Sequence, residues 1–154
     1  MASLINPLVG MTAVLSLAWG GPVPRAPVER AGPDTTITIR STGSALEFQP
    51  SRVSVRQGLQ VRLVYINQST LPHNLVVARD GNDIDLLGLA ALDASGTGYV
   101  PLQHQDRMIA HTRLAAPGDT VQVDFRAPPP GEYLFVCLYA GHFNMMVGTL
   151  RSVR

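Results

Sequence analysis

The stretch "CLYAGHFNMMVGTL", Cys137 to Leu150, contains the one cysteine of this 154-residue chain, one of its four histidines and two of its five methionines. Thiolate, imidazole and thioether groups are metal ligands, and the two sulfur groups suit copper in its reduced state. A lone cysteine, however, is more often a small buried apolar residue. The stretch alone therefore indicates either a metal-binding loop or a piece of core, and the choice depends on further ligands elsewhere.

Alternating apolar and polar residues on both sides of this stretch predict β-strands with one buried face. The alternation is clearest in "VRLVYIN" and "TVQVDF", and weaker strands are predicted in "TITIR", "RVSVR", "HNLVVAR", "YLFVC" and "VGTLRSV". The expected inward residues of the two clearest strands are Val61, Leu63, Tyr65, Val121, Val123 and Phe125. With 12 Pro and 14 Gly to form turns, the pattern predicts an all-β fold, an antiparallel sandwich or Greek-key barrel of about seven to eight strands.

One segment, Asp80 to Arg113, interrupts the strand pattern and is too long for a hairpin turn. Its part "DIDLLGLAALDA" has helical spacing, with acidic residues near the start. We expect a short helix within a flap at about residues 82–105, inserted across one side of the sandwich. The residues predicted to share the apolar face of this helix are Leu86, Leu89, Ala90 and Leu92.

A second histidine stands in "LPHN", Leu71 to Asn74, at the head of a predicted strand. Strand ends that are distant in the sequence can meet at one pole of a Greek-key sandwich, which would bring together His73, Cys137, His142 and Met146. Two imidazoles and a thiolate with a more distant thioether are the ligands of a mononuclear blue copper site. Structural zinc would require more Cys or His and no thioether, and a filled coordination sphere favours electron transfer over metal catalysis.

The remaining histidines, His104 in "LQHQD" and His111 in "IAHT", have no ligand partner nearby in the sequence and are not expected to bind functional metal. The net charge of +1 implies no attraction to nucleic acid. A single cysteine excludes an internal disulfide framework.

The amino-terminal part is predicted to be separate from the folded domain. Residues 4–18 are apolar and uncharged but shorter than the ~20 residues that a membrane-spanning helix needs. The small residues of "SLA" favour a signal peptide, residues 1–18, cleaved after Ala18, although no basic residue precedes the apolar run. A retained membrane anchor is the first alternative, and neither a signal nor an anchor is the second. A Pro/Gly-rich linker at 19–34 and a domain at 35–154 would follow. A signal peptide or an anchor would place the domain outside the cytoplasm, in the periplasm or an equivalent compartment.

Cys-x4-His-x3-Met, with an upstream Pro-His-Asn, resembles the cupredoxins, and specifically the azurin and auracyanin group. The resemblance covers about residues 35–153, including Gly-Thr-Leu after the methionine and "DRMIAHTRL" after the flap. It implies a cupredoxin fold, one type 1 copper ion, and His73, Cys137 and His142 as equatorial ligands with Met146 as the weak axial one. Met145 would be a packing neighbour.

The resemblance also implies roles for residues around the ligands. The Asn74 side chain would tie the two ligand loops together, and the backbone N–H groups of Asn74 and Tyr139 would donate to the Cys137 sulfur. Pro72 stands where azurins have a glycine whose carbonyl approaches copper, which argues against a close fifth contact. The disulfide of azurins is absent.

The expected function is a one-electron shuttle, not an enzyme, which exchanges electrons with redox proteins that dock around His142. The apolar or uncharged residues expected in that docking patch are Leu71, Pro72, Leu138, Tyr139, Ala140, Gly141 and Phe143. The main alternative is a periplasmic copper carrier or buffer, although the chain has no Met-rich run. A copper oxidase or nitrite reductase domain would need His-x-His pairs for additional coppers, and a β-sandwich without metal is the simplest remaining alternative. Residues 4–18 would provide any membrane tether.

Overall fold

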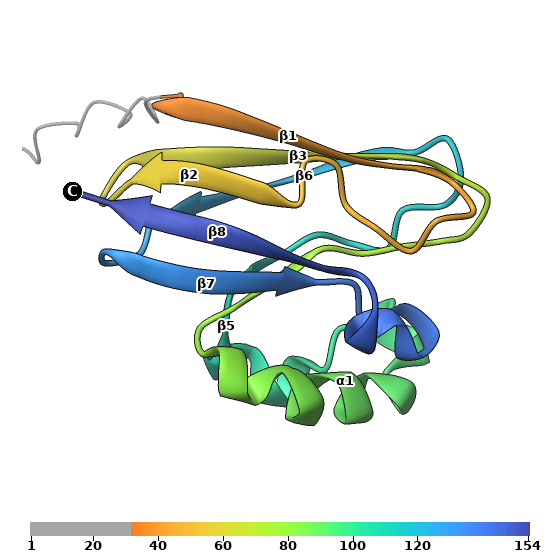
Figure 1. Cartoon of the computed structure of the whole chain (residues 1–154). Coiled ribbons are helices and arrows are strands. Elements are labelled where there is room, and N and C mark those ends of the chain that lie inside the picture. Colours follow the sequence, from red (N-terminus) through yellow and green to blue (C-terminus); the bar gives the residue numbers. More distant parts are fainter. Residues whose placement is uncertain (1–31) are drawn as a thin grey trace, which may run out of the picture. The chain divides into compact units, whose positions relative to one another are not determined.

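The computed structural model describes residues 32–154, which form two β-sheets with a helical flap on one side (Figure 1). The predicted signal or anchor at 1–18, and the predicted linker up to residue 31, lie outside the described residues. Among the described residues, no helix is long and apolar enough to cross a membrane. The strands are β1 (Thr35–Gly43), β2 (Arg52–Arg56), β3 (Gln60–Ser69), β4 (Val76–Ala78), β5 (Met108–His111), β6 (Thr120–Arg126), β7 (Gly131–Val136) and β8 (Val147–Val153).

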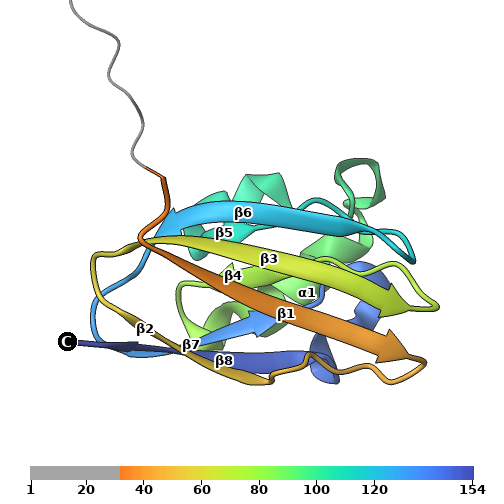
Figure 2. The ribbon, with the colours of Figure 1, turned by 90° about the horizontal axis from the view of Figure 1, so that it is seen from above.

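The first sheet has the order β1-β3-β6 and the second the order β2-β8-β7-β4-β5 (Figures 1 and 2). Two neighbouring pairs, β1 with β3 and β2 with β8, are parallel, and the other pairs are antiparallel. The predicted all-β sandwich is confirmed, but the expected antiparallel pairing does not hold for β1 with β3 or for β2 with β8. The alternation of single strands shows which face is buried and carries no information on which strand lies beside it.

The main core lies between the two sheets and is built from the inward positions of the alternating strands. Val61, Leu63 and Tyr65 of β3 are at most 1% exposed, as their spacing predicts. Phe48 packs edge-on against both Tyr65 and Phe135, with ring centroids 5.8 and 5.3 Å apart. Such pairs contribute stability beyond the area that they bury, so these three rings form a stabilising aromatic cluster in the main core.

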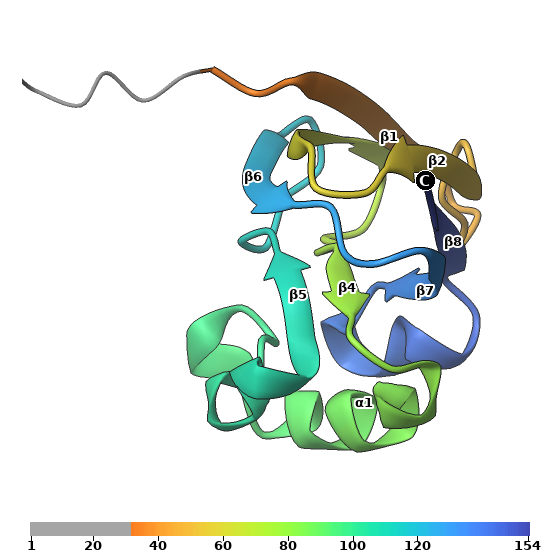
Figure 3. The same cartoon turned by 90° about the vertical axis from the view of Figure 1, so that its left-hand side faces the viewer.

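The flap runs from Gly81 to Arg107 and contains α1 (Ile84–Leu92) and the 3-10 turns η1 (Gly81–Asp83), η2 (Ser95–Thr97) and η3 (Leu102–Arg107). It lies outside the second sheet, beside β4, β5 and β7 (Figure 3). A second apolar core fills this interface, with members from the sheet, the flap and the loop after β7: Val76, Ala78, Ile84, Leu87, Ala91, Val100, Met108, Val136, Leu138 and Phe143.

The predicted apolar face of the helix is wrong. Leu86, Leu89 and Leu92 are 43–62% exposed, whereas the buried residues of α1 are Ile84, Leu87, Gly88 and Ala91. Because the helix carries apolar residues on both sides, its periodicity alone leaves two possible faces. The face with the small residues Gly88 and Ala91 is the buried one, because it lets the helix approach the sheet and the loop after β7 closely.

Gly148 explains the Gly-Thr-Leu motif at the start of β8. An added Cβ at this position would lie 2.2 Å from Cζ of Phe135 and 2.8 Å from the backbone oxygen of Ser51. A real Cβ cannot approach other heavy atoms so closely, so only glycine lets the Phe135 ring lie against its partner residue on β8.

We predict that Gly148→Ala lowers the free energy of unfolding by about 1–3 kcal/mol, the usual cost of overpacking a core. Urea unfolding of the variant would measure the loss. Gly96→Ala is the matched control, because a Cβ there meets nothing within 4 Å. Equal stability of the two variants would contradict the steric role of Gly148.

Candidate metal centre

His73 is held at the entrance to β4 by the backbone. Its N–H donates to the Ala115 carbonyl at 3.0 Å, and the Ala115 N–H donates back to the His73 carbonyl at 2.8 Å. The side chain of Asn67 adds a second tie, because Nδ2 donates to both Leu71 O (2.8 Å) and Ala115 O (2.9 Å). His73 itself is only 1% exposed, so a doubly bridged loop presents its imidazole to the interior.

The other candidate ligands come from the loop between β7 and β8, which contains the 3-10 turn η4 (Tyr139–Asn144). The Cys137 N–H donates to Met146 O at 3.0 Å and closes the base of this loop. The N–H groups of Met145 and Met146 both donate to His142 O, at 2.9 and 2.8 Å. These bonds bring the cysteine, the histidine and Met146 to one end of the sandwich.

Three donor atoms converge at this end. Cys137 Sγ lies 3.4 Å from Nδ1 of His73 and 3.7 Å from Nδ1 of His142, and the two nitrogens are 3.3 Å apart. One point in the plane of these atoms lies about 2.0 Å from all three. This is close to the ~2.0–2.1 Å of a zinc–imidazole bond and slightly less than the ~2.3 Å of a zinc–thiolate bond. The three residues are buried, so the arrangement fits a metal ion.

Met146 and Met145 differ sharply in their surroundings. Met146 is fully buried in the main core together with Cys137, whereas Met145 is 62% exposed. The prediction that Met146 and not Met145 is the axial ligand agrees with this difference in burial. Met145 is the neighbour of that residue in the chain, as expected, but its exposed side chain packs little.

The electrostatics of the pocket favour neutral ligands when no metal is bound. Burial raises the pKa of the Cys137 thiol to about 11, against the opposing effect of hydrogen bonds from the backbone N–H groups of Asn74 and Tyr139. Those two donors are the ones expected from the sequence. Burial also lowers the pKa of His142, and burial followed by repulsion from His142 lowers that of His73 to about 4. Binding of a metal to the thiolate must therefore release a proton.

Asn74 joins the two halves of the site, as expected. Its Oδ1 accepts a hydrogen bond from the Leu138 N–H at 2.7 Å, and its Nδ2 donates to Gly98 O in the flap at 2.9 Å. The contact with the flap was not predicted. Neither was the role of Asn67, although its signal is visible in the sequence: Asn67 is a polar residue at an inward position of the alternating strand β3.

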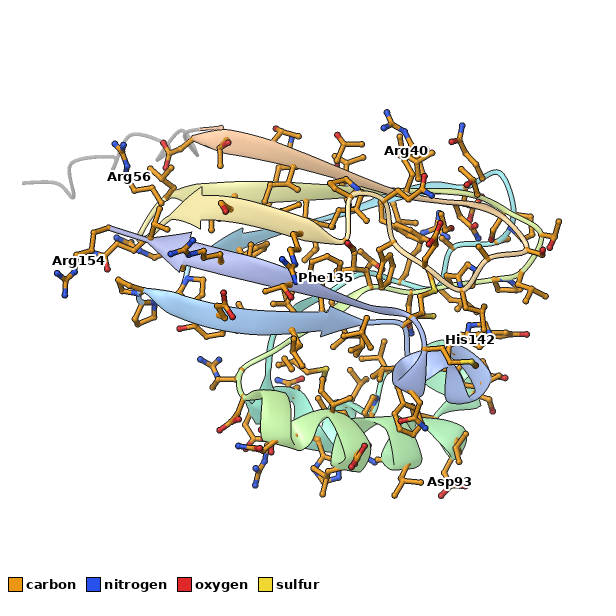
Figure 4. The ribbon with its side chains drawn as sticks, in the orientation of Figure 1. Arg40, Arg56, Asp93, Phe135, His142 and Arg154 are labelled. Atoms are coloured by element: carbon orange, nitrogen blue, oxygen red, sulfur yellow. The ribbon has the colours of Figure 1, made fainter. Side chains whose placement is uncertain are left out.

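The face around His142 differs in part from the predicted docking patch. Leu138 is fully buried and Phe143 is 7% exposed, and both belong to the second core, so their assignment to an exposed patch is wrong. Leu71 and Ala140 are exposed, and Pro72, Tyr139 and Gly141 are partly exposed. His142 is 8% exposed, compared with 1% for His73, and lies at the pole opposite Arg56 and Arg154 (Figure 4). Among residues 32–154, neither His104 nor His111 joins a metal-ligand cluster.

The family model of copper binding proteins of the plastocyanin/azurin family matches residues 35–152. This chain therefore belongs to that family, and copper is the cofactor that its donor set of two imidazoles, a thiolate and a thioether suits.

Several relatives are auracyanins. The chain is 32% identical over 151 residues to auracyanin-A of Chloroflexus aurantiacus, covering 93% of this chain and 91% of the relative. It is 33% identical over 122 residues to auracyanin-B of the same organism, covering 77% of this chain but only 52% of that protein. The crystal structure of dithionite-reduced auracyanin from Roseiflexus castenholzii matches with a TM-score of 0.73 and 30% identity, over 80% of this chain and 100% of the other.

The lowered pKa of His73 predicts a pH-dependent stability of the copper-free protein. Between pH 6.5 and about 4 the unfolded chain binds a proton at this imidazole that the folded chain does not. The contribution of neutral His73 to the free energy of unfolding is therefore fully present above pH 6.5. It is lost as the pH falls towards 4, which lowers the free energy of unfolding by at most about 3 kcal/mol. Urea unfolding between pH 7.5 and 4 would measure it, and His73→Gln should give a shallower profile. Equally steep profiles would contradict the assignment.

Proposed function

We propose that this protein is a blue copper electron carrier in which His73, Cys137 and His142 bind the ion and Met146 is the weak axial ligand. The observation that carries the proposal is the triangle of donor atoms, whose sides of 3.3–3.7 Å leave one equidistant point for a metal. Bound copper would supply a Cu(II)/Cu(I) couple.

The role of the protein is to hold this donor set in one geometry through both redox states. Paired backbone bonds with Ala115 fix His73, and the Asn74 side chain fixes the start of the cysteine loop. Backbone N–H donors on the sulfur stabilise the thiolate. Because these contacts come from the fold and not from the metal, little needs to move when an electron arrives or leaves, and electron exchange becomes fast.

We further propose that partners dock on the uncharged face around His142. Leu71 is 40% and Met145 62% exposed, and His142, at 8%, is the most exposed of the four proposed ligands. Redox partners typically use small interfaces that form and separate quickly. An extracytoplasmic location, with either a cleaved leader or a tether at residues 4–18, is the compartment that the apolar start of the sequence supports.

A copper carrier or buffer remains the second candidate, but the burial of the site disfavours it. Carriers exchange their metal with partners, whereas all three donor residues here are buried and Met146 is 0% exposed. Slow loss of copper to a chelator in a stopped-flow experiment would support the electron carrier.

The ligand assignment predicts a characteristic visible spectrum. The copper-loaded protein should be intensely blue through charge transfer from the thiolate, and Cys137→Ser should abolish the colour while the fold persists. The two methionines provide a matched pair: Met146→Leu should shift the spectrum and the reduction potential, and the exposed Met145→Leu should change neither. A colourless wild-type protein, or a spectral change in Met145→Leu alone, would contradict the assignment.

The docking face predicts the behaviour of electron self-exchange between reduced and oxidised copies of the protein. With a net charge of +1, the rate, measured by NMR line broadening, should change by less than about threefold between low and high salt. Leu71→Glu should slow the exchange by placing like charges face to face. Val153→Glu, at a 36% exposed position next to Arg154 at the opposite pole, is the control that should not. A steep salt dependence or equal effects of the two variants would exclude this face.

A further inference from the structure

The flap packs directly against the loop that carries His142. At Gly88 of α1, an added Cβ would lie 2.3–2.4 Å from three ring carbons of Phe143. The phenyl ring therefore lies against the backbone of the helix, and only a residue without a side chain permits this approach. Because Phe143 follows His142 directly in the chain, α1 restrains the backbone next to that histidine.

A second contact reaches the His142 ring itself. Tyr99 of the flap packs edge-on against Tyr139, with ring centroids 4.9 Å apart, and Tyr139 packs edge-on against His142, with centroids 5.2 Å apart. Tyr99 has a positive φ of 63°, a backbone conformation that is unfavourable for a bulky residue and persists only where its surroundings impose it. The flap thus contacts the loop at two points. Tyr99 reaches the His142 ring through Tyr139, and Gly88 contacts Phe143, the next residue in the chain.

The loop has little regular structure of its own to replace these contacts. Within η4, Ala140 and Gly141 have φ values of 43° and 85° and interrupt the 3-10 turn. The flap also accepts a hydrogen bond at Gly98 O from Asn74 Nδ2, directly before the residue Tyr99. The hydrogen bonds within the loop end at Cys137 and at His142 O, so contacts with the flap add to what fixes residues 139–143.

We propose that the flap is a clamp that positions His142, with Gly88 and Tyr99 as its positioning residues. The clamp rests on the proposed copper site, because the histidine that it holds is one of the proposed ligands. It holds the loop from two sides: Phe143 fixes the backbone and Tyr139 fixes the plane of the imidazole ring. The flap thereby gains a function in the metal site although none of its residues supplies a donor atom.

The first test compares Gly88→Ala with Gly96→Ala, two glycines of the same flap. A methyl group at Gly96 meets nothing within 4 Å, whereas at Gly88 it must displace Phe143. We expect Gly88→Ala to shift the charge-transfer band and the electron paramagnetic resonance of Cu(II), and to weaken copper binding about tenfold, as loss of groups that orient a ligand does. Gly96→Ala should match the wild type. Identical spectra and affinities for all three proteins would overturn the clamp.

A readout without copper separates the clamp from the copper site. In the copper-free protein the amide protons of Met145 and Met146, which donate to His142 O, should exchange with solvent at least about tenfold faster in Gly88→Ala than in Gly96→Ala. If exchange is faster in Gly88→Ala but the wild-type protein stays colourless with copper, the clamp is upheld and the copper site is rejected. If exchange is equal in the two variants but the wild-type protein turns blue, the copper site is upheld and the clamp is rejected.

Three further variants keep the test decisive if Gly88→Ala unfolds. Phe143→Leu removes ring atoms that a methyl group would strike, so Gly88→Ala/Phe143→Leu should regain part of the lost affinity relative to Gly88→Ala. Tyr99→Ala removes the ring on Tyr139 and should shift the Cu(II) spectrum, whereas Tyr99→Phe retains the ring and should not. Equal spectra for the two Tyr99 variants would overturn this half of the clamp.

Discussion

The hydrogen bond from the Leu138 N–H to Asn74 Oδ1, at 2.7 Å, is the contact on which the site depends. It joins two segments 64 residues apart in the chain and links the loop before β4, which contains His73, to the loop after β7, which contains Cys137. It is completely buried, so loss of either partner would leave an unsatisfied polar group in the interior. The convergence of the donor atoms therefore depends on a contact between two groups that are not themselves proposed metal ligands.

The residues that directly follow β7 face the two cores in turn. Cys137 faces the main core with Met146, and the next residue, Leu138, faces the second core with Phe143. The alternation of a strand thus continues one step into the loop and places ligands on one side and anchors on the other. The same loop binds the proposed ion and packs against both the sandwich and the flap. A change in the packing of either core would therefore displace the donor atoms.

The sequence predicts most of the fold and the donor set, because both depend on local patterns. The period-two alternation identifies the inward residues of β3 and β6, and the spacing of Cys137, His142 and Met146 within one loop is visible directly. The predictions fail where a residue's environment is set by a distant segment. From the sequence, Leu138 and Phe143 are expected at the surface of a ligand loop, but the flap covers both. The sequence of α1 has two apolar faces, and contact with Phe143 and the sheet determines which one is buried. The parallel pairing of β1 with β3 and of β2 with β8 is likewise invisible in single strands.

Complete burial of Cys137 also has a chemical consequence for the copper-free protein. Oxidants and disulfides react with the thiolate and need access to the sulfur, but this thiol has a pKa of about 11 and no exposed surface. It is neutral at physiological pH and out of reach of a second copy. In an oxidising environment, the copper-free chain is therefore protected from forming a disulfide-linked dimer through Cys137. Its thiol is likewise protected from oxidation to sulfenic acid.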